Sequence, residues 1–204
     1  MSSKQIHRCT CGECVVGHGE ILITPDHIQC LLDAIQLYCR IPAVQLLGHQ
    51  ATMSAADKQA LLPEKVLVQK SITVSFDGLT ILVSGMGDFK ISRALFRRTA
   101  ALLGLPSSRA KHHQLNPEWL EPFAMTGLKK GMVSPFFAPS HAKRLPYDAV
   151  VLLEPITQKP GEYVAVSLSL AKSLLVPASH LYEVIQGYAA RIYPQISVHS
   201  LRYT

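Results

Sequence analysis

The stretch that decides the fold runs from Glu64 to Phe76 and reads Glu-Lys-Val-Leu-Val-Gln-Lys-Ser-Ile-Thr-Val-Ser-Phe. Apolar and polar side chains alternate along it, with the period of two that is typical of a β-strand. One predicted face is apolar except for Lys70, whose ammonium must snorkel to water, find a partner or line a cavity. Lys70 is therefore either a lysine at the edge of a sheet or a candidate site residue.

Asp77-Gly78 follows this strand directly and favours a tight β-hairpin, so we expect a second strand at 79–85. The remaining patterns predict a loop at 109–113, helices near 24–39, 54–61, 92–103, 117–127 and 181–188, and strands near 43–47, 131–136, 148–153, 163–169, 173–176 and 195–201. Hairpins with interspersed helices do not make a doubly wound pattern. The sequence predicts a mixed α/β fold, with a largely antiparallel twisted sheet or partial barrel and flanking helices.

The length of 204 residues and the hydrophobic content of 48% suit one domain with an extension. We expect residues 1–23 to form a cysteine-containing N-terminal extension and residues 24–204 to form the folded domain. No apolar run is long enough to span a membrane, and the N-terminus lacks the hydrophobic block of a secretion signal. The expected location is the cytoplasm, with no membrane partner.

A second stretch, from Thr126 to Phe136, reads Thr-Gly-Leu-Lys-Lys-Gly-Met-Val-Ser-Pro-Phe. Its glycines permit positive φ and close approach of another molecule, and Pro135 pushes Ser134 toward an extended conformation. The backbone amides of residues 131–134 are therefore candidate donors to an oxyanion, a carbonyl or a phosphate. An ordinary tight turn between a helix and a strand would show the same spacing.

Lys70 on its strand, followed later by Thr-Gly-x-x-x-Gly-x-Val-Ser-Pro-Phe, resembles the YbaK/prolyl-tRNA synthetase editing-domain family. The similarity runs from about Asp26 to about Ile192. Members of that family hydrolyse amino acids wrongly attached to tRNA, so the resemblance implies a YbaK-like fold and a trans-acting aminoacyl-tRNA deacylase. It also implies that Lys70 binds near the acceptor end of tRNA, and that Gly131 shapes the loop that holds the ester carbonyl.

The aminoacyl ester is already activated, so the enzyme needs to position it and to stabilise the oxyanion while water, or a group of the substrate, attacks. We expect catalysis to depend on Lys70, Gly131 and Ser134. The residues expected to contact the substrate are His49, Thr126, Gly127, Met132, Val133, Pro135 and Phe136. The walls of the amino acid pocket are expected to be Val68, Ile72, Met132, Phe136 and Leu168. The residues expected to contact the tRNA backbone are Lys129, Lys130, Lys143 and Arg144.

The net charge of +6 and the pI near 9.1 suit a polyanionic partner, although a solvated basic surface would give the same values. The expected partners are the acceptor end of mischarged tRNA and an aminoacyl-tRNA synthetase. Family members usually carry a glycine near the position of Leu168, which this chain lacks. A catalytically inactive module that binds tRNA or a synthetase on the same fold is therefore the alternative function.

Three cysteines lie close together near the start of the chain, at Cys9, Cys11 and Cys14, with His7 beside them. They could offer zinc ligands, yet a typical structural zinc site uses two separated pairs and the sequence shows no second pair. We therefore expect no metal and no cofactor. A metal-responsive protein whose N-terminus is the working part remains a third interpretation.

Overall fold

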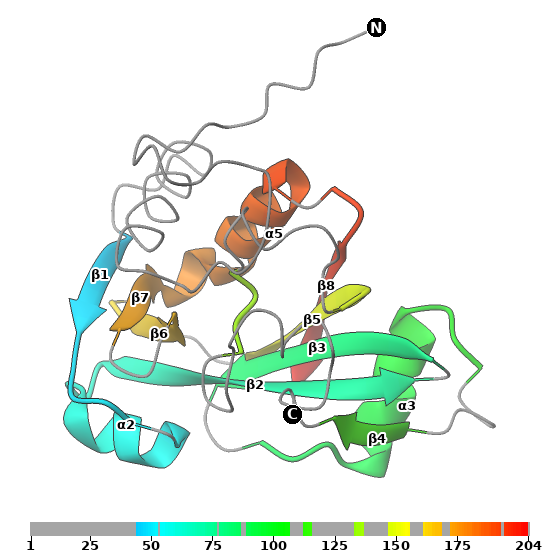
Figure 1. Cartoon of the computed structure of the whole chain (residues 1–204), viewed down its shortest axis with the longest axis horizontal. Helices are drawn as coiled ribbons and strands as arrows, with labels where there is room; N and C mark the ends of the chain where they lie inside the picture. The colour runs from blue at the N-terminus through cyan, green and yellow to red at the C-terminus, as the bar shows by residue number, and fades with distance from the viewer. Residues whose placement is uncertain are drawn as a thin grey trace, which may run out of the picture.

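The computed structural model describes residues 44–52, 54–76, 78–86, 89–106, 112–115, 133–136, 147–155, 161–168, 172–192 and 194–203. In these ranges the elements are β1 (Gln45–Gly48), α2 (Ala55–Leu61), β2 (Val66–Phe76), β3 (Leu79–Met86), α3 (Arg93–Leu102), β4 (His112–Leu115), β5 (Ala149–Pro155), β6 (Tyr163–Ser167), β7 (Lys172–Pro177), the 3-10 turn η3 (Ala178–His180), α5 (Leu181–Ile192) and β8 (Ser197–Tyr203). Figure 1 shows α5 on one side of the sheet, and α2 and α3 on the other.

The described strands form one open mixed sheet in the order β1-β7-β6-β2-β3-β5-β8, with β4 paired to β2 off this path. Four pairings are antiparallel: β1–β7, β6–β7, β2–β3 and β2–β4. Three are parallel: β2–β6, β3–β5 and β5–β8. The predicted mixed α/β fold with flanking helices is confirmed, and antiparallel pairings are the more frequent kind.

Strand β2 is long because its two halves pair with different partners. Its first residues, Val66–Val68, pair in parallel with β6. From Gln69 onward β2 pairs with β3, and its last residues pair on the other side with β4. The hairpin predicted from Asp77-Gly78 joins β2 to β3, and Gly78 takes the positive φ of 87° that favours glycine. β2 therefore changes its neighbour within the stretch that contains Lys70.

Two hydrophobic clusters hold the helices against the sheet. On one side, which we call the α3 face, Phe76 stacks on Phe96 of α3 with ring centroids 4.4 Å apart. On the other side, the α5 face, residues such as Leu82, Val166 and Leu174 pack with Ile185 and Tyr188 of α5. Because side chains alternate along a strand, each residue of the sheet is assigned to one of these faces.

Helix α2 is fixed at both its start and its middle. The Ser54 hydroxyl caps the helix by accepting a hydrogen bond from the Asp57 amide at 3.0 Å. The Gln59 side chain donates to the Val66 carbonyl at 2.8 Å and accepts from the Val68 amide at 3.0 Å. The side-chain amide of Gln59 thus makes the two hydrogen bonds that a neighbouring strand would make with this edge of β2. Helix α2 is therefore docked firmly beside the start of β2.

Two sequence predictions are wrong in the part of the chain that the structure describes. Residues 133–136 form no strand, because Pro135 supplies no amide hydrogen and the Ser134 hydroxyl takes the Phe136 amide. His112 and His113 were expected in a loop, yet they form β4 by pairing with Phe76 and Ser75. The predicted extension at 1–23 and the helices near 24–39 and 117–127 lie outside the described residues.

Candidate functional site

Lys70 lies half-buried on β2, and its ammonium is held by the segment that follows β3. Its Nζ donates to the Phe89 carbonyl at 3.2 Å and lies 5.7 Å from the centre of the Phe89 ring. Gly85 pairs with Lys70 across the hairpin, and a Cβ there would come within 3.0 Å of Leu153 and 3.1 Å of Phe89. The absence of a side chain at Gly85 thus leaves room for the Phe89 ring, and the backbone carbonyl of Phe89 orients Lys70.

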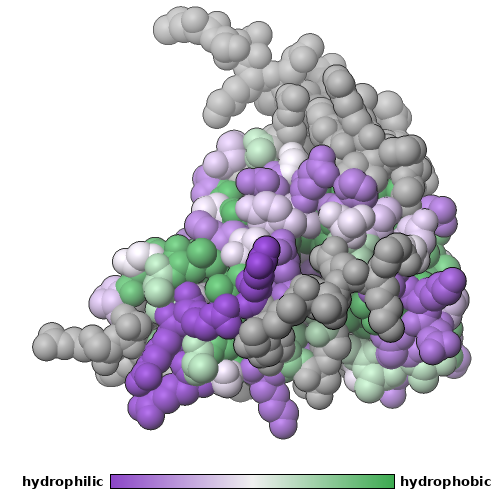
Figure 2. All heavy atoms as spheres, turned by 180° about the vertical axis from the view of Figure 1, so that it is seen from behind, coloured by the Kyte–Doolittle hydropathy of each residue, from purple (hydrophilic) through white to green (hydrophobic). Residues whose placement is uncertain are grey.

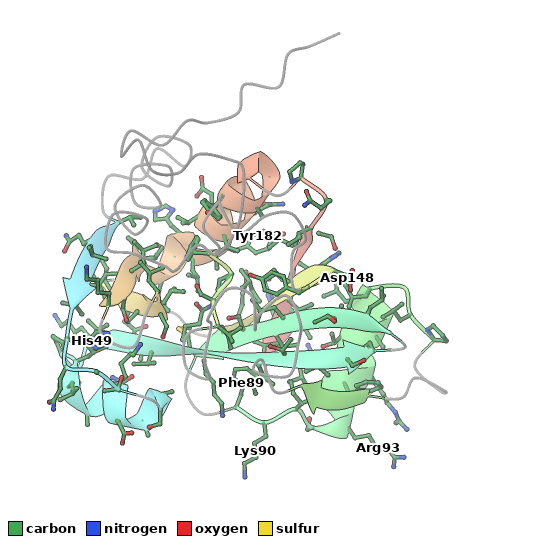
Figure 3. The ribbon with its side chains drawn as sticks, viewed as in Figure 1. His49, Phe89, Lys90, Arg93, Asp148 and Tyr182 are labelled. Atoms are coloured by element: carbon green, nitrogen blue, oxygen red, sulfur yellow. The ribbon has the colours of Figure 1, made fainter. Side chains whose placement is uncertain are left out.

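A second lysine on the same side of the molecule is almost fully buried. Lys58 of α2 is 3% exposed, and its Nζ donates to the hydroxyls of Ser167 at 2.6 Å and Ser173 at 3.2 Å. The Nε2 atom of His49 lies 2.9 Å from the Ser173 hydroxyl. Figure 3 places His49 next to β1 and α2. We call Lys58, Ser167, Ser173 and His49 the Lys58 cluster.

Burial changes the acidity of the Lys58 ammonium, because a charged amine loses hydration when it leaves water. Desolvation by burial lowers the pKa of Lys58 to about 8. An amine with that pKa is partly neutral near neutral pH, so it can accept a proton as well as donate a hydrogen bond. Lysines with such a shift are candidates for functional sites.

Lys70 and the Lys58 cluster lie on one face of the sheet. Val166 and Leu174 pack on the α5 face, so the neighbouring Ser167 and Ser173 lie on the α3 face, as Lys70 does. The parallel register pairs Val66 with Tyr163 and Val68 with Ala165. This pairing ends at Val68 and Ala165, two residues before Lys70 and Ser167, while β3 begins to pair with the opposite edge of β2 at Gln69.

The described end of the predicted glycine loop has a structural arrangement of its own. Ser134 is buried, its hydroxyl accepts from the Phe136 amide at 3.1 Å, and its carbonyl accepts from the Tyr147 hydroxyl at 2.7 Å. Burial first, and Tyr188 second, raise the pKa of Tyr147 well above its usual value, so this hydroxyl remains a donor. Phe136 packs edge-on against Tyr188, with ring centroids 5.4 Å apart.

The predicted site residues that the structure describes lie on two different sides of the sheet. Lys70 and His49 lie on the α3 face or next to it, whereas Val133 and Phe136 belong to the hydrophobic cluster on the α5 face. Pro135 forms the bend between Ser134 and Phe136. The predicted residues outside the described part of the chain are Thr126, Gly127, Lys129, Lys130, Gly131, Met132, Lys143 and Arg144.

The residues expected to form the amino acid pocket do not lie together. Val68 and Ile72 point to the α3 face, while Phe136 and Leu168 are buried on the α5 face. The sheet separates the two pairs, so they cannot line one pocket. Val68 and Ile72 share one face because side chains alternate along β2. The predicted pocket combined them with residues that are buried on the other face.

A cavity of about 190 Å³ opens on the α5 face, between β3, β5 and the start of α5. Its polar lining comes from Ser84, Glu154, Ser179 and Tyr182. Figure 3 shows Tyr182 and Phe89 on opposite sides of the sheet, so this cavity is separate from the surroundings of Lys70.

Lys58, Ser167 and Ser173 were not among the site residues predicted from the sequence. Lys58 stands in Ala-Ala-Asp-Lys-Gln-Ala-Leu, where a lysine is expected to be solvated, and its serine partners come from the distant strands β6 and β7. The one available signal was Ser167 itself, a polar residue at the end of the apolar strand Tyr-Val-Ala-Val. That signal does not identify a partner on a helix so far away in the sequence.

The described residues show no helix that is both long and apolar enough to cross a membrane. Within the same ranges, no three His, Cys, Asp or Glu side chains come together as ligands of a metal ion. Cys9, Cys11 and Cys14 lie outside them.

No family model matches this chain, and no curated protein matches its sequence. Its fold is similar to that of a crystal structure of a candidate trans-editing enzyme for prolyl-tRNA synthetase, with a TM-score of 0.53 and 16% identity over 89% of this chain and 99% of the other. A second solved structure, from work on epitope backbone grafting to scaffold proteins by computational design, gives a TM-score of 0.48 and 12% identity over 89% and 99%. At such identities the first likeness shows the fold, which agrees with the mixed α/β architecture predicted from the sequence.

Proposed function

We propose that this chain is an aminoacyl-tRNA deacylase of the YbaK/prolyl-tRNA synthetase editing-domain family, which removes wrongly attached amino acids in trans in the cytoplasm. The observation that carries the proposal is Lys70. It is a half-buried lysine on the apolar face of β2, oriented by the Phe89 carbonyl and located where β2 parts from β6. The fold shared with a candidate trans-editing enzyme supports the same function.

A basic surface next to Lys70 supports a polyanionic partner. Phe89 is followed by the exposed Lys90, and helix α3 then contributes exposed arginines and no acidic residue. Figure 3 shows Lys90 and Arg93 pointing away from the ribbon, and Figure 2 shows hydrophilic side chains gathered over the side that carries α3. The exposed basic residues of this surface are Lys90, Arg93, Arg97, Arg98 and Arg202. Their positive charge suits the phosphate backbone of an acceptor stem.

In the proposed reaction Lys70 binds a phosphate or the ribose at the acceptor end, and so positions the ester. The backbone amide of Gly131, which precedes the buried Val133 and Ser134, is the proposed donor to the oxyanion, and the lack of a side chain there gives the substrate access to the backbone. The Ser134 hydroxyl has an auxiliary role, because it already caps the turn to Phe136. No cofactor takes part.

A panel of mischarged tRNAs, scored for hydrolysis by the full chain, tests this function. The proposal predicts that at least one aminoacyl-tRNA loses its amino acid faster than in buffer alone, and that the activity survives a chelator. A filter-binding assay on the same tRNAs separates the alternative. Equal binding of charged and uncharged tRNA without hydrolysis would identify an inactive module that binds tRNA or works with a synthetase.

A further inference from the structure

The Lys58 cluster has a geometry that docking of α2 alone does not require. The Ser54 cap and the Gln59 amide already fix this helix on the sheet. Lys58 nevertheless enters the interior, where an ammonium loses its hydration, and meets two serine hydroxyls from neighbouring strands. An apolar side chain at this position would avoid that cost, so the amine calls for a functional explanation.

The two serines differ in distance and access. The Ser167 hydroxyl lies 2.6 Å from Lys58 Nζ, whereas that of Ser173 lies 3.2 Å away and also contacts His49. Ser173 is 0% exposed, while Ser167 retains 9%. Ser167 is therefore the less enclosed of the two serines, and it makes the shorter contact with the amine. Ser167 follows the last residue of β6 that pairs with β2 by two positions, and Lys70 follows the last paired residue of β2 by two.

We propose that Ser167 and Lys58 form a nucleophile–base pair, in which Ser167 takes up the acyl group of an activated ester and Lys58 moves the protons. A serine paired with a lysine is a known variant of nucleophilic catalysis on unrelated folds. The identity of the ester, an aminoacyl-tRNA oriented by Lys70, rests on the proposed function. Ser173 and His49 are positioning residues, because the Ser173 hydroxyl contacts both the Lys58 amine and the His49 ring.

The reaction has two steps. In the first, the neutral amine of Lys58 removes the hydroxyl proton as Ser167 Oγ attacks the carbonyl carbon. The bond from that carbon to the ribose oxygen then breaks, and the ammonium of Lys58 gives its proton to the leaving oxygen. In the second step, the same amine deprotonates a water that attacks the acyl-serine, and the proton returns to Ser167 as the free amino acid departs.

The pH dependence follows from the need for a neutral amine. Burial holds the pKa of Lys58 at about 8, so acylation rises with pH up to that region and then levels off. The other titratable groups assigned to this face near the cluster are His49 after β1, Lys70 on β2 and Tyr163 on β6. A His49→Gln variant, profiled in parallel, shows whether the imidazole contributes to the curve.

The test uses p-nitrophenyl acetate as a small activated ester, with intact-protein and peptide mass spectrometry. We expect acetylation of Ser167 that hydroxylamine reverses, absent in Ser167→Ala and retained in Ser197→Ala, an exposed serine of β8. Both Lys58→Met and Lys58→Arg should slow acetylation at least about a hundredfold, since arginine keeps the charge and the donors but cannot act as a base. Recovery of the rate in Lys58→Arg would mean a purely structural role for Lys58 and overturn the proposal.

The remaining outcomes either overturn the Ser167 assignment or separate it from the deacylase function. A label on Ser173, or a hydroxylamine-stable label on the Lys58 nitrogen, identifies a different nucleophile. If mischarged tRNA is hydrolysed equally well by Ser167→Ala, the deacylase function stands and the serine nucleophile is wrong. If no tRNA is hydrolysed while Ser167 is acetylated in a Lys58-dependent way, the pair stands and acts on another ester.

Discussion

Replacing Lys58 by methionine should alter how the stability of the protein depends on pH. Methionine keeps the length of the side chain and removes the charge, whose burial in the interior is unfavourable. It also removes the donor to Ser167, which costs about 1 kcal/mol at every pH. The two effects differ in pH dependence, so they can be separated in one experiment.

The magnitude follows from the pKa of Lys58. An unfolded lysine titrates near about 10.4, whereas burial holds Lys58 at about 8 in the folded state. Between these values the unfolded chain binds more protons than the folded chain, so the free energy of unfolding of the wild type increases with pH. The whole difference corresponds to about 3 kcal/mol, of which about 2 kcal/mol falls between about pH 7 and pH 9.5.

Urea unfolding of the wild type and of Lys58→Met across that pH range measures this effect. The wild type should gain about 2 kcal/mol relative to the variant as the pH rises. Lys65→Met is the matched control, because it removes a lysine from an exposed position. If the free energies of unfolding of the wild type and of Lys58→Met differ by the same amount at all pH values, burial does not lower the pKa of Lys58, and the reasoning is wrong.

Three further results are expected. Gln59→Ala should destabilise the protein by about 1–3 kcal/mol in urea unfolding, because the Val66 carbonyl and the Val68 amide both lose a partner; an unchanged midpoint would contradict the docking of α2. Gly131→Val should reduce single-turnover deacylation more than Ser134→Ala does, with both variants shown folded by circular dichroism; the reverse order would make the serine the essential group. Elemental analysis of protein from a reducing cytoplasm should find no stoichiometric zinc, and one zinc per chain would favour a working role for the N-terminal cysteines.

The central hairpin could be predicted because its signals are local. Alternation from Val66 to Phe76 and the Asp77-Gly78 pair specify two antiparallel strands without reference to the rest of the chain. The serine caps of α2 and α3 could be predicted for the same reason. Strand β4 was missed because His-His-Gln-Leu has no alternating apolar pattern and depends on pairing with the end of β2.

The candidate site could be predicted only in part. Lys70 was identified because it breaks an apolar pattern, which is a local signal. Lys58 breaks no pattern, because a lysine on a short polar helix is normally exposed. Its burial arises from the parallel pairing of β2 with β6, which brings Ser167 and Ser173 to the helix from more than a hundred residues away. A pattern over neighbouring residues cannot predict contacts between residues so far apart in the sequence.

Single-turnover hydrolysis by Lys70→Ala, on the aminoacyl-tRNA that the wild type hydrolyses fastest, decides whether Lys70 positions the substrate. Circular dichroism must first show that the variant keeps the wild-type fold after loss of the contact to the Phe89 carbonyl. At subsaturating tRNA we expect a rate at least about tenfold lower, which corresponds to about 1.4 kcal/mol, since Lys70 positions the acceptor end. A folded Lys70→Ala variant that hydrolyses the same tRNA at the wild-type rate would show that Lys70 does not position the acceptor end.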